Sequence, residues 1–455
     1  MRNSAIVLLI SLLIVSPAVF GSQEKFDKGK LDDLLHKLDI NKKAMFGMVI
    51  SKNGKTVYEN YIGFASVKDK LPITKLTKFR IGSITKIFTA SIIFQLIEEG
   101  KIKLSSKLSG FFPKIVNAEK ITISDLLSHR SGIHNITSDK DYPKYMTKKK
   151  SKKEMLAIIT KCKPDFKPGE KFSYSNSNYL LLGYIIEKIT GKPYREELKT
   201  RITDRIGLKN TYYGGKIDIR SNEAKSYMFE LGEWKEGPET DMSIPHGAGA
   251  IVSTPKDLTV FITSLFSGKL ISKDSLNQMK DIRDGYGRGL MIFPFNGRFA
   301  FGHDGGIDGF ISNVAYFPND KVAVSLISNG IHYNFNNILI GILSIYFNLP
   351  YKIPDLSAKE FKIETAELKK FEGKFTSKML PLEITLKIKE GKLFAQATGQ
   401  SEFQLTSFGE TEFRFEAAGL TLKFSKDKNG KILYDSFILN QAGKDFLYKK
   451  QIVKK

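Results

Sequence analysis

Ser83 and Lys86 stand three residues apart in the segment Phe79–Ala90, which reads FRIGSITKIFTA. The apolar residues after them predict a helix to about Glu99 that ends at Gly100, because glycine suits the left-handed residue past a helix end. Residues three apart share a helix face, so the hydroxyl and the amine would meet. A serine hydroxyl needs an adjacent base, and a lysine kept neutral by its surroundings can supply one. The pair therefore predicts a serine nucleophile.

The Ser-x-x-Lys spacing alone is weak evidence in a chain so rich in lysine. It recurs at Ser22–Lys25, Ser253–Lys256 and Ser425–Lys428. Those matches fit a signal-cleavage region, a helix start and a hairpin turn. For Ser83–Lys86 too, an ordinary helix cap beside a surface lysine remains an alternative. Other parts of the chain are therefore needed to tell a nucleophile from a cap.

Tyr174 and Asn176 lie in a polar loop, PGEKFSYSNSNY at Pro168–Tyr179, before a helix predicted over Leu180–Thr190. Alternate side chains of an extended backbone point the same way, so both residues could face one cleft. A nearby lysine ammonium would lower the pKa of the tyrosine and let it act as a base. An asparagine amide can accept from a lysine and donate to a substrate carbonyl. A capping loop with a packed tyrosine is the alternative.

A third candidate is the glycine-rich stretch FGHDGGIDGF at Phe301–Phe310, just before a predicted strand pair. Glycines there let backbone and ligand approach closely, and a backbone N–H could join that of Ser83 in an oxyanion hole. We expect His303 to project into the cleft, where it would move a proton or bind a substrate carboxylate. Its titration would make activity depend on pH at about 6 to 7. A turn histidine without a role is the alternative.

Strand patterns flank the region that holds these residues. Met45–Ser51 and Lys55–Phe64 meet at Asn53-Gly54, a strong hairpin pattern. Later strands are predicted over Arg298–Gly302, Ile311–Phe317 and Val322–Ser328. The chain between them is largely helical, and a helix over Asn334–Phe347 closes the domain. This order predicts an α+β fold in which both ends of the domain build one antiparallel sheet flanked by helices.

The pattern of apolar and turn residues changes after Pro354. A linking helix is predicted near Ala358–Leu368, followed by eight short strands with glycine turns between them. Such spacing is typical of an all-β barrel or sandwich. We therefore predict a hydrolase domain over residues 22–352 and an all-β accessory domain over residues 353–455, in which we find no nucleophile, base or metal-ligand cluster.

The N-terminus predicts export. A charged start is followed by an apolar run, Ala5–Val15, and by small residues that favour cleavage near Gly21. An uncleaved anchor is the alternative. Cys162 is the only cysteine, which excludes an intramolecular disulfide. The six histidines are dispersed, so we expect no metal site and treat His129 and His134 as structural or loop residues.

The formal net charge is +23, and Lys148–Lys153 form a dense basic run. The lysines are scattered elsewhere, without the arginine-rich face or aromatic interleaving of a nucleic-acid site. Contact with an anionic envelope surface is one interpretation. A lysine bias on a solvated surface is the other.

Together the three motifs resemble the penicillin-recognising serine hydrolases, which include class C β-lactamases, D-alanyl-D-alanine carboxypeptidases and related esterases and D-aminopeptidases. The flanking phrases ISDLLSHRSGI and GAGAIVSTPKDL occur in the family's order, and the C-terminal block resembles a small lipocalin-like domain. The resemblance implies a β-lactamase/transpeptidase-like fold without a cofactor. It also implies a small-molecule or short-peptide substrate, with peptidoglycan as one candidate.

By that resemblance Ser83 is the nucleophile, Lys86 and Tyr174 handle its proton, and Asn176 positions the substrate. His303 and Gly305 fill the family's Lys-Thr-Gly element, and the N–H groups of Ser83 and Gly306 form the oxyanion hole.

His303 replaces the lysine that class C β-lactamases carry, which favours a D-alanyl-D-alanine carboxypeptidase, D-peptidase or esterase over a β-lactamase. A β-lactamase and a non-catalytic penicillin-binding receptor remain alternatives. The sequence leaves the substrate and the oligomeric state open.

Overall fold

The computed structural model describes residues 26–230, 232–357, 361–400, 402–415, 419–441 and 444–451. The predicted signal segment, residues 1–21, lies outside the described residues. The chain divides into two compact units, one formed by residues 44–331 and the other by residues 1–43 with 332–455. The domain boundary predicted at residue 352 stays a prediction.

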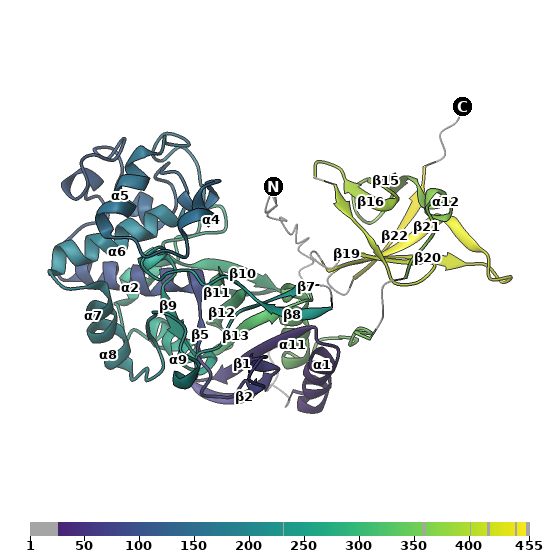
Figure 1. The fold of residues 1–455 in the computed structure, drawn as a ribbon, viewed down its shortest axis with the longest axis horizontal. Coiled ribbons are helices and arrows are strands. Elements are labelled where there is room, and N and C mark those ends of the chain that lie inside the picture. The colour runs from purple at the N-terminus through teal and green to yellow at the C-terminus, as the bar shows by residue number, and fades with distance from the viewer. Residues whose placement is uncertain are drawn as a thin grey trace. The chain divides into compact units, whose positions relative to one another are not determined.

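A six-stranded sheet, in the order β10-β11-β12-β13-β1-β2, forms the centre of the unit 44–331 (Figure 1). Neighbouring strands are antiparallel throughout. The strands are β1 Ala44–Lys52, β2 Lys55–Ile62, β10 Met291–Phe295, β11 Arg298–Ile307, β12 Phe310–Phe317 and β13 Val322–Ile331. In the register Ile50 lies opposite Val324. The first and last strands of the unit are therefore neighbours, which confirms the predicted sheet.

The β1–β2 turn forms as the sequence predicts. Asn53 and Gly54 both have positive φ, 52° and 75°, which a two-residue hairpin of this kind requires. β1 and β13 are buried along almost their whole length, as expected of central strands covered on both faces. Helix α9, Pro255–Phe266, packs against β1, β12 and β13 and covers part of that surface.

The remaining helices of this unit lie between β2 and β10 in the chain. They are α2 Thr85–Glu98, α3 Ile123–Leu127, α4 Tyr142–Tyr145, α5 Lys152–Lys161, α6 Asn176–Thr190, α7 Tyr194–Leu198, α8 Asp204–Ile206 and α10 Lys273–Met279. Helix α2 is buried all round, from Thr85 to Leu96, and packs against α6. Since α2 follows Ser83 and α6 begins at Asn176, this packing brings two of the predicted motifs together.

Three small sheets complete the unit 44–331. Their strands are β3 Phe64–Ser66 with β4 Leu71–Pro72, β5 Phe79–Arg80 with β9 Ile251–Ser253 and β6 Tyr212–Tyr213, and β7 Tyr227–Glu230 with β8 Glu233–Glu236. The pairing of β5 with β9 matters for the site, because β5 directly precedes the Ser83 turn.

The described part of the other unit contains the helices α1 Lys28–Ile40 and α11 Phe335–Tyr346, a short helix α12 Thr365–Leu368, and an antiparallel sheet that follows α12. Its nine strands are β14 Gly373–Thr376, β15 Ile384–Lys389, β16 Lys392–Ala397, β17 Phe403–Gln404, β18 Thr406–Ser407, β19 Glu412–Phe415, β20 Leu420–Lys426, β21 Ile432–Gln441 and β22 Lys444–Lys450. The two edge strands, β17 and β18, are separated in the chain by Leu405 alone. The sheet is therefore a nearly closed barrel, as predicted.

Three expectations need correction in detail. Strand β10 was not expected from the sequence, although it pairs with β11. One of the eight short strands predicted after Pro354, the one expected over Glu402–Ser407, is divided into β17 and β18 at Leu405, whose side chain enters the barrel core. The described part of the predicted linking helix is helical only over Thr365–Leu368. Among the described residues we find no helix long and apolar enough to span a bilayer.

Candidate active site

Ser83 lies in a 3-10 turn, η1 Gly82–Ile84, that leads directly into α2. The predicted helix start is therefore present, with tighter winding at the serine itself. Gly82 and Ile84 are buried, whereas Ser83 is half-buried. The turn thus presents this hydroxyl to solvent from a rigid part of the core.

Lys86 is fully buried in the first turn of α2, and its Nζ donates to three acceptors. Ser83 Oγ lies at 2.9 Å, Asn176 Oδ1 at 2.8 Å and the Ala248 carbonyl oxygen at 2.8 Å. The ammonium form has three protons, one for each of these partners, whereas the neutral amine has two protons and a lone pair that can accept from the Ser83 hydroxyl. The predicted meeting of hydroxyl and amine is present in the structure.

None of these three partners carries a negative charge, so nothing among them stabilises the protonated form of the Lys86 amine. Burial disfavours the charged form of a lysine and lowers the pKa of Lys86 well below its usual range. A lysine without a carboxylate partner in a buried site can lose its proton near neutral pH. The amine beside Ser83 can therefore serve as a general base.

Tyr174 lies beside the same amine, with Lys86 Nζ 4.9 Å from the centre of its ring. Burial raises the pKa of Tyr174, the charge of Asp304 raises it further, and a hydrogen bond to Ser83 acts in the opposite direction. The expectation that Lys86 would lower this pKa is wrong, since Lys86 is itself driven to its neutral form. Tyr174 is a protonated phenol in contact with Ser83, suited to relay a proton rather than to remove one unaided.

Asn176 is the first residue of α6, and three hydrogen bonds fix its position. Its Oδ1 accepts from Lys86, its Nδ2 donates to Thr137 Oγ1 at 2.9 Å, and its backbone N–H donates to Asn135 Oδ1 at 3.0 Å. The second proton of Nδ2 remains for a ligand. The predicted link between Asn176 and the lysine is thus present.

His303 is brought to the same place but does not project into the cleft. It is only 2% exposed. Its Nδ1 lies 2.5 Å from the Asp304 carbonyl oxygen, which can only accept, so Nδ1 carries the proton and Nε2 accepts from the Tyr286 hydroxyl at 3.0 Å. Burial, with the nearby Lys86, lowers the pKa of His303 to about 3. The imidazole is neutral near pH 7, so a titration of His303 at about pH 6 to 7 is not expected.

Gly82 and Gly306 bring two backbone segments into close contact. A Cβ on Gly82, whose φ is +51°, would lie 2.8 Å from the nitrogen of Gly306. Only glycine permits both this conformation and this approach. The Ser83 turn therefore lies against β11, so that the N–H groups of Ser83 and Gly306 come from adjacent segments, as an oxyanion hole requires.

An ion pair ties the same two segments together behind the site. Arg80 donates to Asp308 Oδ2 at 2.9 Å, and their side chains are 2% and 0% exposed. The guanidinium also donates to the carbonyl oxygens of Thr240 and Gly215. Arg80 lies three residues before Ser83, and Asp308 lies two residues after Gly306. Sequence reasoning missed this pair, although both residues belong to the quoted motifs.

Two further histidines lie near the site. His129 is fully buried, its ring centre 4.3 Å from that of Tyr174, and its Nδ1 accepts from the Ser175 backbone N–H. His134 forms hydrogen bonds with Asp139 and Asp165. Both contacts fit the structural roles expected. In the part of the chain that the structure describes, no group of histidine, cysteine and acidic residues has the arrangement of a metal site.

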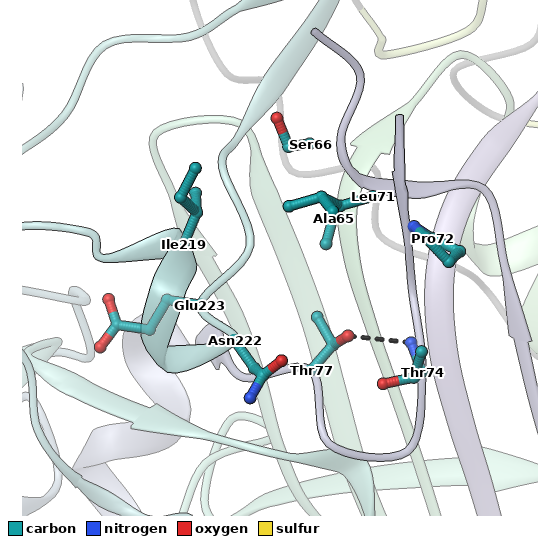
Figure 2. Close-up of a pocket in the computed structure, with 9 residues that line it drawn as sticks. All are labelled: Ala65, Ser66, Leu71, Pro72, Thr74, Thr77, Ile219, Asn222 and Glu223. Carbon is teal, nitrogen blue, oxygen red and sulfur yellow. Dashed lines mark hydrogen bonds between the residues drawn. The ribbon is translucent and has the colours of Figure 1, made fainter. Parts of the chain in front are cut away.

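A separate pocket of about 170 Å³ lies elsewhere in this unit (Figure 2). Its lining residues are Ala65, Ser66, Leu71, Pro72, Thr74, Thr77, Ile219, Asn222 and Glu223. The lining contains no lysine or histidine to activate Ser66, whose hydroxyl donates to Asp69. Ser83 therefore remains the candidate nucleophile.

Comparison with known proteins gives consistent results. The family model described as Beta-lactamase matches residues 35–339. A curated relative, the teichoic acid D-alanine hydrolase of Staphylococcus aureus (strain MRSA252), is 30% identical over 288 residues, which are 62% of this chain and 69% of the relative.

Solved structures show the same fold. D-amino acid amidase from Ochrobactrum anthropi SV3 is 27% identical with a TM-score of 0.62, over 70% of this chain and 99% of the amidase. The octameric penicillin-binding protein homologue from Pyrococcus abyssi is 25% identical with a TM-score of 0.65, over 93% of this chain and all of that protein. These likenesses confirm the β-lactamase/transpeptidase-like fold that the motifs implied.

Proposed function

The chain belongs to the beta-lactamase family and is a serine hydrolase, and we propose that it cleaves D-alanyl ester or amide bonds through an acyl-enzyme on Ser83. The observation that carries the mechanism is the hydrogen bond of 2.9 Å between Ser83 Oγ and the buried amine of Lys86, whose three hydrogen-bond partners are all uncharged. This arrangement supplies a nucleophile and a neutral base in direct contact.

The reaction begins when the Lys86 amine takes the proton from Ser83 and the oxygen attacks the substrate carbonyl carbon. Negative charge develops on the carbonyl oxygen, where the N–H groups of Ser83 and Gly306 stabilise it. The proton then passes from Lys86, directly or through the Tyr174 hydroxyl, to the leaving oxygen or nitrogen as its bond to carbon breaks. Water attacks the resulting ester, with its proton accepted by the same base. The acid is released and Ser83 is regenerated.

The substrate class comes from the relatives. One is named for the hydrolysis of D-alanine from teichoic acid and another for the hydrolysis of D-amino acid amides. Ester and amide bonds of D-alanine share the acyl group that Ser83 would carry. We therefore extend the proposal to D-alanyl esters and amides, with peptides that end in D-alanine and β-lactams as weaker substrates.

The relative's substrate, teichoic acid, also supports a location at or outside the cell envelope. We propose that residues 1–21 act as an export signal that is removed near Gly21. N-terminal sequencing of the protein recovered from the envelope or the medium tests this. An intact Met1 on the exported protein contradicts cleavage.

Activity profiling tests the function as a whole. The purified protein is assayed against D-alanine methyl ester, D-alaninamide, a D-alanyl-D-alanine peptide and nitrocefin, with Ser83→Ala as the blank. We expect turnover of the D-alanyl ester or amide that disappears in the variant. Equal turnover in the wild type and the variant contradicts the proposal.

A further inference from the structure

The β11 segment His303–Gly306 has two different faces. His303 is buried, and a Cβ on Gly305 would lie 2.1 Å from the Ile81 carbonyl oxygen, so these two positions face packed protein. A Cβ on Gly306 would meet nothing within 4 Å, and Asp304 is exposed. Alternate residues of a strand share a face. Asp304 therefore lies on the open face with Gly306, whereas His303 does not.

The carboxylate of Asp304 is held at one oxygen and available at the other. Asn313, opposite Asp304 in the β11–β12 register, donates from Nδ2 to Oδ1 at 2.6 Å. Asn313 itself is 4% exposed, so it provides a fixed support. Among the described residues no hydrogen-bond donor is assigned to Oδ2 of Asp304. The side chain is thus oriented, with one acceptor left for a ligand.

Asp304 also lies within electrostatic reach of the catalytic groups. Its charge contributes to the raised pKa of Tyr174, which contacts Ser83. Along the strand, two residues span about 7 Å, which is the approximate separation of Asp304 from Gly306 and the predicted oxyanion hole. An ammonium group near the scissile carbonyl is within reach of a carboxylate at that separation.

The other titratable groups around Tyr174 do not offset this negative charge. Burial lowers the pKa of Lys86, His129 and His303, which favours their neutral forms. Desolvation by the surrounding protein raises the pKa of Asp304 to about 6, and the hydrogen bond from Asn313 acts in the opposite direction, so the carboxyl remains mostly ionised near pH 7. Among these groups Asp304 is therefore the one that carries a charge near pH 7.

We infer that Asp304 selects substrates that carry a free ammonium group near the scissile carbonyl and disfavours those that carry a carboxylate there. This inference rests on the proposed function and deepens it, because it favours D-alanyl esters and amides with a free amine over peptides that end in a free D-alanine. It also replaces the expectation that His303 recognises a substrate carboxylate.

Three matched esters test the inference. D-alanine methyl ester, N-acetyl-D-alanine methyl ester and N-succinyl-D-alanine methyl ester share the D-alanyl core and the methoxide leaving group but present a cation, a neutral amide and an anion. We compare kcat/KM near pH 7 in the wild type, Asp304→Asn and Asp304→Lys. The surface variant Asp274→Asn, which removes an exposed carboxylate from α10, is the matched control.

We expect the wild type and Asp274→Asn to prefer the cationic ester over the neutral one. In Asp304→Asn this preference falls about tenfold, because one charge–charge interaction in a partly solvated site is lost. Asp304→Lys shifts the preference to the succinyl ester. A preference that is the same in all four proteins overturns the inference while leaving the proposed function intact.

A binding measurement on the wild type keeps the inference testable if the variants fold poorly or turn over slowly. In the wild type, D-alaninamide should protect Ser83 from a fluorophosphonate at a lower concentration than N-acetyl-D-alaninamide does. Equal protection by the two compounds overturns the inference. Absence of both labelling and turnover in the wild type contradicts the proposed function itself, and with it the inference.

Discussion

The chemistry of the site is set by neutral forms of groups that are usually charged. Lys86 lies among uncharged acceptors, and His303 has one ring nitrogen donating and the other accepting. Two cations this close would repel each other, and burial removes the water that would screen them. The result is a base beside Ser83 and an imidazole that orients its neighbours without titrating near pH 7.

The first prediction concerns pH. We expect kcat/KM for D-alanine methyl ester to fall as pH drops through about 6, because Asp304 has its pKa raised to about 6 and loses its negative charge on protonation. Above that pH the carboxylate attracts the cationic substrate. His303, with its pKa lowered to about 3, does not contribute in this range.

The variant Asp304→Asn assigns this effect in pH–rate profiles. The fall near pH 6 should disappear in the variant, whereas any fall common to both proteins belongs to protonation of Lys86. Identical profiles in the two proteins remove Asp304 from the explanation.

At the scale of elements, the site depends on the contact between the η1 turn and β11. Gly82 allows the approach, and the Arg80–Asp308 ion pair holds the segments on either side of it. Neither element alone forms the predicted oxyanion hole. Substitutions at Gly82 or in the Arg80–Asp308 ion pair should therefore affect catalysis by displacing the catalytic groups, because none of these residues takes part in the reaction itself.

A second prediction isolates the close contact at Gly82. Gly82→Ala places a Cβ 2.8 Å from the Gly306 nitrogen, so η1 and β11 must separate. We expect kcat to fall about 100-fold, the loss typical of a damaged oxyanion hole. Steady-state kinetics on a D-alanyl ester measures this.

Gly100→Ala is the matched control, since Gly100 also has a positive φ, +70°, but a Cβ there meets nothing within 4 Å. Both variants incur a backbone cost of about 1–2 kcal/mol. A similar kcat in the two variants contradicts the proposed role of the contact.

A third prediction concerns the ion pair. Asp308→Ala leaves the guanidinium of Arg80 buried with its partner carboxylate removed, although Glu239 remains at 3.1 Å. Breaking a buried pair costs about 3–5 kcal/mol, so urea denaturation should show a large decrease in the free energy of unfolding. Asp320→Ala breaks the more exposed pair with Arg298 and should cost less than about 1 kcal/mol. Equal losses contradict a buried structural role for Asp308.

The sequence predicts individual helices, strands and turns better than the tertiary contacts between them. Hydrophobic pattern and turn residues suffice for the β1–β2 hairpin and for the end of α2 at Gly100, because both depend on local chemistry. The third acceptor of Lys86, the Ala248 carbonyl, comes from 162 positions further along the chain. The orientation of His303 depends in the same way on Tyr286. Such contacts are set by tertiary packing, so no local pattern could predict them.

At the scale of the molecule, the net charge of +23 predicts attraction to anionic surfaces. The fourth prediction is that the protein sediments with vesicles of anionic lipid at low salt and is released as salt rises, because the Debye length falls from about 10 Å at 0.1 M to about 3 Å at 1 M. Changing Lys148, Lys149 and Lys153 to glutamine should weaken the binding, whereas changing them to arginine should preserve it.

Binding of all three proteins to neutral vesicles, or of none to anionic vesicles at low salt, contradicts this attraction. In either case the abundant lysine is only a solvated surface without a partner of this kind. Neither outcome bears on the chemistry at Ser83, because the hydrogen bonds that Lys86 forms with Ser83, Asn176 and Ala248 do not involve these lysines.

Intact-mass spectrometry after incubation with a fluorophosphonate and with a penicillin shows whether Ser83 is the nucleophile. We expect one covalent adduct, located on Ser83 by peptide mapping and absent in Ser83→Ala. We also expect that Lys86→Met slows labelling by about 1,000-fold or more, since the nucleophile loses its base, while Lys149→Met labels at the wild-type rate. An unmodified wild-type protein with both reagents, or an adduct that persists in Ser83→Ala, rules out Ser83 as the nucleophile.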